Sequence, residues 1–288
     1  MFLLCGASSG IGEQITYELA KLGAKVIIVA RSTDKLEVVR ETAEKEYGAP
    51  SGSVHVIRCD MSDMDQVQAL VPEALKVYGR IDHVLLNHAA LPNGPFLAMP
   101  HQQTPVYLEK LFKTNVFSYI QLMLAVLPEV EKNSGHILVT SSISGEQPFL
   151  LYGPYSSTKH ALNGFFYSLQ QELLAKKSTA TVSVAILGII MTKEQTELIS
   201  DSFKDLPDLF KGDLVECALA MVDNFVTRAR TVAYPKFAVY FGRFVWWLTP
   251  FGHEMVLADE GFYDAAVRFS EKGRELSKAT GYQSNNLS

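Results

Sequence analysis

The chain has 288 residues, 48% of them hydrophobic, and a formal net charge of −5 at neutral pH. With no break rich in Pro, Gly or Ser, this length can bury one sizeable core, so we expect a single domain over residues 1–288. The negative charge argues against nucleic acid as a partner. The three cysteines lie far apart and the seven histidines form no His-x-x-x-His pair, so the sequence indicates neither a disulfide framework nor a bound metal.

An apolar strand at residues 2–5 runs into a glycine-rich turn at residues 6–12, and a helical pattern follows at residues 14–22. A second apolar strand at residues 25–30 completes a βαβ unit. In such a unit the turn and the start of the helix present backbone N–H groups to the pyrophosphate of a dinucleotide. We therefore expect contacts to the cofactor from Gly6, Ser8, Ser9, Gly10, Ile11 and Gly12.

The pair Arg31-Ser32 follows the second strand, nineteen residues after Gly12. A site for NAD normally offers Asp or Glu to the ribose hydroxyls at this place, whereas the fork of an arginine suits a phosphate. The sequence therefore predicts NADP(H) as the cofactor, with Arg31 and Ser32 at its 2′-phosphate. An ordinary solvated arginine at a strand end is the alternative interpretation.

Four more strands are predicted, at residues 54–59, 83–87, 136–141 and 182–187, with helices between them. Right-handed crossovers then give an α/β fold with a Rossmann-like, doubly wound parallel sheet of about seven strands and helices on both faces. Ligands of such sheets bind at the carboxyl ends of the strands. The candidates there for further contacts to the cofactor are Asp60, Met61, Asn87, His88 and Ala89.

Tyr155 and Lys159 are four residues apart in a helical segment, so their side chains share one face of the helix. A phenol has an unperturbed pKa of about 10, and a neighbouring ammonium is expected to lower it toward neutral pH. Ser142, at the end of an apolar run that starts at His136, offers a hydroxyl to hold a substrate oxygen. The pattern indicates general acid/base chemistry; alone, it would equally describe a surface tyrosine beside a solvated lysine.

Taken together, these motifs resemble the short-chain dehydrogenase/reductase superfamily over about residues 2–194. The resemblance implies that Ser142, Tyr155 and Lys159 are catalytic and that Asn115 holds a water in a proton relay with the lysine. It also implies that Lys159 lowers the pKa of Tyr155 and grips the nicotinamide ribose. The expected cofactor site then includes Tyr155, Lys159, Ile190 and Thr192.

At two places the sequence departs from the common pattern of the superfamily, and there it is similar to the 11β-hydroxysteroid dehydrogenase type 1 branch. The chain has Asn87-His88-Ala89-Ala90 in place of Asn-Asn-Ala-Gly, and Leu187-Gly188 in place of Pro-Gly. That branch is NADP-dependent, dimeric and tethered to the endoplasmic reticulum, and it acts on steroid and other lipophilic carbonyls. Ser9 stands where the branch usually has a lysine for the 2′-phosphate, and Met191 where it has an acidic residue.

The expected function is therefore NADP(H)-dependent interconversion of a ketone and a secondary alcohol on a bulky lipophilic substrate of the steroid class. Ser142, Phe149, Leu151, Tyr152 and Leu187 are expected to form the substrate site. A carbonyl, retinoid or fatty-acyl reductase would use the same catalytic residues. A nucleotide-binding regulator without turnover is an alternative from another class, which the four matched catalytic positions disfavour.

Residues 188–230 are expected to form the substrate loop and helices, and residues 231–288 an aromatic, amphipathic carboxyl-terminal appendage. Within the appendage, residues 237–251 include Trp246 and Trp247 and are interrupted by Arg243, which makes them too short and too charged to span a bilayer. They are expected either to lie in a membrane interface, to cover a homodimer contact, or to pack on the core. No signal peptide or long apolar run precedes the first strand, so we expect a truncated form or a short isoform without an anchor.

Overall fold

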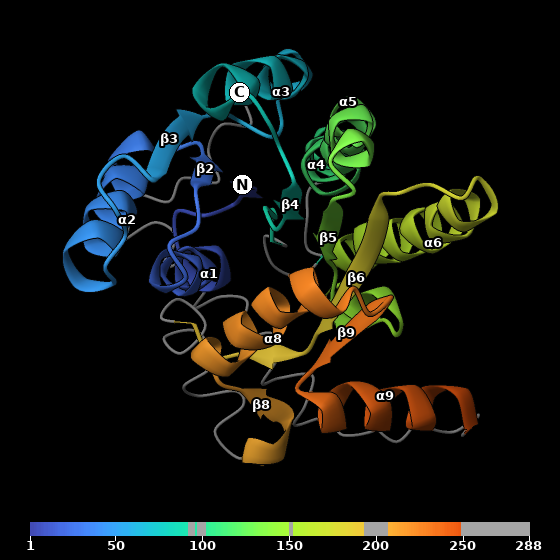
Figure 1. Ribbon diagram of the computed structural model, residues 1–288. Helices are drawn as coiled ribbons and strands as arrows, with labels where there is room; N and C mark the ends of the chain where they lie inside the picture. The colour runs from blue at the N-terminus through green and yellow to red at the C-terminus, as the bar shows by residue number, and fades with distance from the viewer. Residues whose placement is uncertain (92–95, 97–101, 150–151, 193–206, 249–288) are drawn as a thin grey trace.

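Seven parallel strands form the central sheet of the computed structural model, which describes residues 1–91, 96, 102–149, 152–192 and 207–248 (Figure 1). Their order in the sheet is β3-β2-β1-β4-β5-β6-β9. The predicted fold class is confirmed. The strands are β1 (Phe2–Cys5), β2 (Val26–Ala30), β3 (Val54–Arg58), β4 (His83–Leu86), β5 (His136–Thr140), β6 (Thr181–Leu187) and β9 (Thr231–Tyr234), and a separate two-stranded sheet joins β7 (Ile189–Ile190) to β8 (Lys211–Gly212).

Helices cover both faces of the sheet (Figure 1). One face carries α1 (Gly10–Lys21), α2 (Thr33–Glu46) and α8 (Leu214–Thr227). The other carries α3 (Met64–Tyr78), α4 (Thr104–Phe112), a π-helical turn η2 (Lys113–Phe117), α5 (Ser118–Lys132) and α6 (Gly153–Ala175). The structure also describes the 3₁₀ turns η3 (Ile143–Gly145) and η4 (Asp208–Phe210), and α9 (Lys236–Leu248).

The central strands are apolar along their whole length because helices cover them on both sides. In β2 and in β5 all five residues are buried, including the polar His136 and Thr140 of β5. Alternate side chains of each strand therefore enter two separate cores, one beneath α1, α2 and α8 and one beneath α3, α5 and α6.

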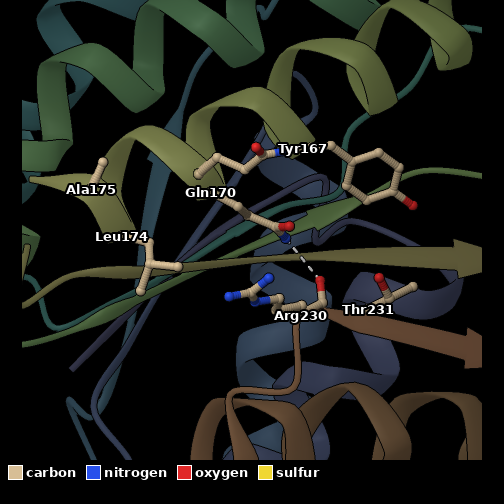
Figure 2. Close-up of a pocket in the computed structure, with 7 residues that line it drawn as sticks. Tyr167, Gln170, Leu174, Ala175, Arg230 and Thr231 are labelled. Atoms are coloured by element: carbon tan, nitrogen blue, oxygen red, sulfur yellow. Dashed lines mark hydrogen bonds between the residues drawn. The ribbon is translucent and has the colours of Figure 1, made fainter. Parts of the chain in front are cut away.

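The seventh strand, β9, lies at the start of the segment that the sequence assigned to an appendage. It pairs in parallel with β6, with Val184 opposite Thr231 and Leu187 opposite Tyr234. Its four residues are mostly half-buried, as expected of an edge strand, and therefore lack the continuous apolar run of the central strands. The side chain of Gln170 on α6 fastens this edge, since its Nε2 donates to the carbonyl of Val182 at 3.1 Å and to that of Arg230 at 2.8 Å (Figure 2).

The chain order reverses between β1 and β4, because β2 and β3 continue the sheet to one side and β5, β6 and β9 to the other. Connections from neighbouring strands leave in opposite directions at such a switch point and open a crevice at the carboxyl edge. The glycine turn after β1 and the Asn87 turn after β4 border it. The fold thus gathers at one edge most of the segments singled out from the sequence.

The continuous helix Thr104–Lys132 is the one helix, among the residues that the structure describes, that is long and apolar enough to cross a membrane by length and composition. Core helices of soluble domains meet the same criteria. In this helix, 44% of the apolar 18-residue stretch is buried inside the protein, and α5 packs against α3 and β5. The helix therefore has a role in the core, which also accounts for its apolar composition.

Two histidines, His83, which is half-buried, and His136, which is fully buried, lie side by side at the amino-terminal edge of the sheet. The His136 imidazole contacts Thr181 Oγ1 at 2.8 Å and Asn224 Oδ1 at 3.0 Å, and the rings of His83 and His136 both pack on Phe225. Burial lowers the pKa of each histidine to about 4. Both are therefore neutral in the folded protein at pH 7.

We expect the free energy of unfolding to decrease as the pH falls from about 6.5, the pKa of an unfolded histidine, toward the folded-state value of about 4. The unfolded chain binds protons in this interval and the folded chain does not, so stability present above the interval is lost through it. Urea unfolding at several pH values measures the effect. His136→Gln should show a shallower loss than the parent, whereas His55→Gln on the exposed face of β3 should match the parent. Equal pH dependence in all three proteins would contradict the assignment.

Candidate active site

The glycine turn after β1 can be built only with glycine at two of its positions. Gly6 has φ of +80°, and a Cβ placed there would lie 2.6 Å from the His88 nitrogen. A Cβ on Gly12 would lie 2.1 Å from the Gly6 carbonyl oxygen. The Asn87 side chain closes the turn from the other side, since its Nδ2 donates to the same oxygen at 3.2 Å. The turn is therefore held tightly against the end of β4, with Ser8, Ser9, Gly10 and Ile11 partly exposed.

The first turn of α1 offers unpaired N–H groups beside this loop. Ser9 is the N-cap, and its side chain makes no capping hydrogen bond. A Cβ on Gly10 would lie 3.2 Å from the Thr192 methyl group, so the segment after β7 reaches the same turn. Ile190 itself is buried in the core beneath α8. A helix N-terminus with free N–H groups fits the pyrophosphate of a dinucleotide.

Arg31 is exposed at the carboxyl end of β2. Within the part of the chain that the structure describes, its guanidinium has no carboxylate partner. Ser32 is the N-cap of α2 and makes no side-chain capping bond. The cation and the hydroxyl are both accessible to an anionic group at this strand end, which fits the 2′-phosphate of NADP(H).

Asp60 and Met61, two of the residues expected to contact the cofactor, make contacts within the protein. The Asp60 carboxylate accepts from the Ser62 N–H and hydroxyl at 2.9 and 2.8 Å, and the Met61 side chain packs in the core. Both residues shape the turn after β3. Ala89, by contrast, is exposed.

The His88 side chain points into the protein, where Nε2 lies 2.8 Å from the Ser118 hydroxyl. The Tyr119 hydroxyl donates to the His88 carbonyl, and the two rings lie 4.2 Å apart. Burial, followed by the charge of Lys159, lowers the pKa of His88 to about 3. A neutral imidazole in this position joins the end of β4 to α5.

Asn115 is fully buried in the π-helical turn between α4 and α5. Its Oδ1 accepts from the Ala90 N–H at 2.7 Å, and its Nδ2 donates to the Ala90 carbonyl at 2.9 Å and to the Thr158 hydroxyl at 3.2 Å. Such π turns alter the direction of side chains within a helix and are frequent at functional sites. The amide of Asn115 thereby joins the loop after β4 to α6, one residue before Lys159.

Lys159 is 1% exposed and lies in the centre of the site. Its Nζ donates to the Thr140 carbonyl at 2.9 Å and lies 5.7 Å from the ring centre of Tyr119 and 5.6 Å from that of Tyr155. Burial lowers the pKa of Lys159 to about 7. The spacing inferred from the sequence therefore does place the ammonium beside the phenol ring.

The effect on the phenol differs from the expectation. Burial, then the proximity of Tyr152, raises the pKa of Tyr155 above its ordinary value, while a hydrogen bond with the Ser142 side chain lowers it. The predicted depression by Lys159 is therefore wrong for this structure. Desolvation acts on both partners, since it disfavours the charged phenolate and also the charged ammonium that would stabilise it.

Ser142 begins the 3₁₀ turn η3, and its Oγ accepts from the Ser144 N–H at 3.1 Å. Gly145, which follows Ser144, packs so closely on α6 that a Cβ would lie 2.7 Å from the Lys159 carbonyl oxygen. The Asn163 side chain donates to the Gly145 carbonyl at 2.9 Å. These contacts hold the Ser142 hydroxyl beside Tyr155.

The residues expected to bind substrate lie in different parts of the structure, some beside Tyr155 or exposed and one in the core. Phe149 is 37% exposed, and the Tyr152 ring lies 6.1 Å from that of Tyr155 in an edge-on arrangement. Leu187 is 4% exposed and packs in the core beneath α8. Leu151 lies outside the described residues.

Two residues of this arrangement were not singled out from the sequence. Thr158 and Asn163 are three and eight residues after Tyr155, which places them on the helical face that carries Tyr155 and Lys159. Helical spacing was therefore the signal that could have identified them. The partners that come from other elements, such as Tyr119 and the Thr140 carbonyl, had no comparable signal.

Comparison with known proteins places this site in a family. The sequence profile of the short chain dehydrogenase family matches residues 1–202. Proteins named "Hydroxysteroid 11-beta-dehydrogenase 1-like protein" are 34% identical over 264 residues in Danio rerio and 33% identical over 248 residues in Gallus gallus. The alignments cover 91% of this chain and 87% of the fish protein, and 86% of this chain and 79% of the bird protein.

Solved structures share the fold. An actinorhodin polyketide ketoreductase variant with NADPH superimposes with a TM-score of 0.71 at 21% identity, covering 83% of this chain and 97% of that one. ElxO with NADP bound gives a TM-score of 0.71 at 23% identity, covering 83% and 98%. On the match of its sequence and the agreement of its fold, the chain belongs to the short-chain dehydrogenase family and is an oxidoreductase of that family.

Proposed function

We propose that this protein is an NADP(H)-dependent oxidoreductase that interconverts a ketone and a secondary alcohol on a lipophilic substrate of the steroid class. The observation that carries the proposal is the buried Lys159, whose Nζ lies 5.6 Å from the centre of the Tyr155 ring while the turn that begins at Ser142 packs against the Lys159 backbone. The hydroxyl of Ser142 and the phenol of Tyr155 can then hold one substrate oxygen and exchange a proton with it. The names of the 11-beta-dehydrogenase-like relatives support the substrate class.

The residues present fit the cofactor. The turn at Gly6 and Gly12 has no room for side chains, α1 offers its N-terminus, and Arg31 offers a cation to the 2′-phosphate. Lys159 would hold the nicotinamide ribose. When bound, the nicotinamide supplies or accepts the hydride.

The protein's own residues supply orientation and the proton. Ser142 holds the substrate oxygen, and Tyr155 donates its phenolic proton to that oxygen during reduction. Its raised pKa keeps the phenol protonated at neutral pH, which is the form that a general acid needs. Asn115, fixed through Ala90 and Thr158, orders the relay that returns a proton toward Lys159.

The exposed face of α9 supports a peripheral membrane contact. Phe237, Tyr240, Phe241 and Phe244 are exposed on one stripe of this helix, and Phe210 packs on two of them with ring centres 5.4 and 5.9 Å apart. Trp246, which the sequence suggested, is half-buried and has contacts of its own. Aromatic side chains favour the bilayer interface. We extend the proposal to association with the endoplasmic reticulum membrane, as a homodimer.

Tyr155→Phe should reduce turnover by about 10²–10⁴-fold, because it removes the transferable proton and little else. NADPH binding, measured by fluorescence titration, should stay close to that of the parent. Tyr78→Phe is the matched control, since it removes a phenolic hydroxyl on α3, where it donates to the Gly52 carbonyl and is not part of the site; it should retain most of the activity. Turnover within a few-fold of the parent in Tyr155→Phe would refute the catalytic assignment.

Arg31→Asp should shift preference toward NADH, with a loss for NADPH on the order of 1.5–3 kcal/mol, the value of a charged hydrogen bond. Ratios of kcat/KM for the two cofactors measure the shift. Arg58→Asp, at the end of the adjacent strand β3, makes the same charge change as a control and should leave the ratio nearly unchanged. A parent protein that already prefers NADH would show that Arg31 has no such role.

If α9 lies in a membrane interface, the protein should sediment with phospholipid vesicles, and Phe241→Ser with Phe244→Ser should release it. Cofactor binding should be unaffected, because the stripe is separate from the glycine turn. The control is Leu219→Ser with Val226→Ser, which removes exposed apolar side chains from α8. A parent protein that never sediments, or equal release by both double variants, would eliminate the membrane contact.

A further inference from the structure

A pair of charged residues far apart in the sequence joins α9 to the turn that carries Ser142. The Arg243 guanidinium donates from Nε and from an Nη to the two carboxylate oxygens of Glu146. This bidentate pair is mostly shielded, with side-chain exposures of 29% for the arginine and 13% for the glutamate. Bidentate geometry and partial burial make such a pair stronger and more directional than an ordinary surface ion pair.

Glu146 is the residue that ends the turn that Ser142 begins. Ser142 is the N-cap of η3 and Glu146 its C-cap, and the N–H groups of Gly145 and Glu146 donate to the carbonyls of Ser142 and Ile143 at 2.8 and 3.0 Å. The turn is therefore a single hydrogen-bonded unit of five residues. A displacement of Glu146 is transmitted to Ser142 over one turn of chain.

A second contact presses α9 onto the same turn. A Cβ on Gly242 would lie 2.9 Å from the Ile143 Cδ1 and 2.9 Å from the Gln147 Nε2. Glycine in a helix interior is unfavourable by about 0.5–1 kcal/mol relative to alanine, so this close approach gives Gly242 a packing role. Gly242 and its neighbour Arg243 thus contact Ile143, Glu146 and Gln147 from one side.

Glu146 is also linked to the edge of the sheet. The Tyr167 hydroxyl on α6 lies 3.5 Å from Glu146 Oε1, and Tyr167 lines the same hollow as Thr231, the first residue of β9. Figure 2 shows the Tyr167 ring and Thr231 at one end of the hollow on this edge. The carboxylate of Glu146 therefore connects two elements, α6 and α9, to the Ser142 turn.

We propose that Glu146 and Arg243 form a latch that positions the Ser142 hydroxyl on the substrate oxygen, which makes α9 a positioning element of the active site. This inference rests on the proposed function. The outer face of α9 carries the exposed aromatic stripe, and its inner face touches the turn that begins at Ser142, so one helix joins the stripe to this turn. Neither residue touches the reacting atoms; they act through Ser142.

The first test needs no turnover. Hydrogen exchange of the peptide covering residues 143–147 should become faster in Arg243→Ala, because the hydrogen-bonded turn loses its support. Exchange in residues 2–21, at the glycine turn and α1, should stay unchanged. Lys236→Ala, which removes an exposed cation from the first turn of the same helix, is the control and should leave both regions unchanged.

The second test uses steady-state kinetics with NADPH and a lipophilic ketone that the parent reduces. Arg243→Ala should lower kcat on the order of ten- to a hundredfold, the cost of misplacing a catalytic group by a fraction of an ångström to one ångström. KM for NADPH should change less than about threefold, because the glycine turn is not involved. Arg243→Lys should recover part of kcat. The double variant Glu146→Arg with Arg243→Glu, which reverses both charges, should have a higher kcat than either single variant.

The outcomes separate the latch from the proposed function. An active parent whose kcat is unaffected by Arg243→Ala, or exchange that rises evenly over the whole chain, would overturn the latch and leave the proposed function intact. A parent that binds NADPH yet reduces no ketone would overturn the proposed function. Faster exchange confined to residues 143–147 would then still establish the mechanical link between α9 and the Ser142 turn.

Discussion

The site depends on the burial of one ammonium group. Lys159 has a backbone carbonyl as its hydrogen-bond partner and two aromatic rings around it, which is little compensation for a charge taken out of water. The consequence is a pKa lowered to about 7. The arrangement holds only while β5, α5 and α6 keep the Thr140 carbonyl, Tyr119 and Tyr155 in place around it, so the rigidity of the core is a condition of the chemistry.

The parallel sheet explains how the remaining parts reach this lysine. Every strand ends at the same edge, so the glycine turn after β1, the Asn87 turn after β4 and Ser142 after β5 lie along that edge. Close approach does the rest. Gly6, Gly12 and Gly145 each stand where a Cβ would overlap backbone, and they bring β1, β4, η3 and α6 within contact distance.

Much of the fold could be predicted because the central strands are buried on both faces and read as continuous apolar runs. The edge strand β9 was not recognised, since it has four residues, three of them only half-buried, and carries no periodic signal. Spacing on α6 also predicted that Lys159 lies beside Tyr155. Spacing could not predict whether the pKa of Tyr155 is raised or lowered, because the shift depends on burial by residues from other elements. Glu146 and Arg243 are 97 positions apart in the sequence, so no local pattern could predict their pairing.

We propose that this edge of the sheet binds NADP(H) and that the enzyme reduces a lipophilic ketone there. The most direct measurement is nicotinamide absorbance in a single-turnover mixture of the protein, NADPH and each member of a panel of steroid and other apolar ketones. We expect stoichiometric loss of absorbance with at least one steroid ketone and formation of the corresponding secondary alcohol. Tight binding of NADPH with no loss of absorbance for any ketone would contradict it.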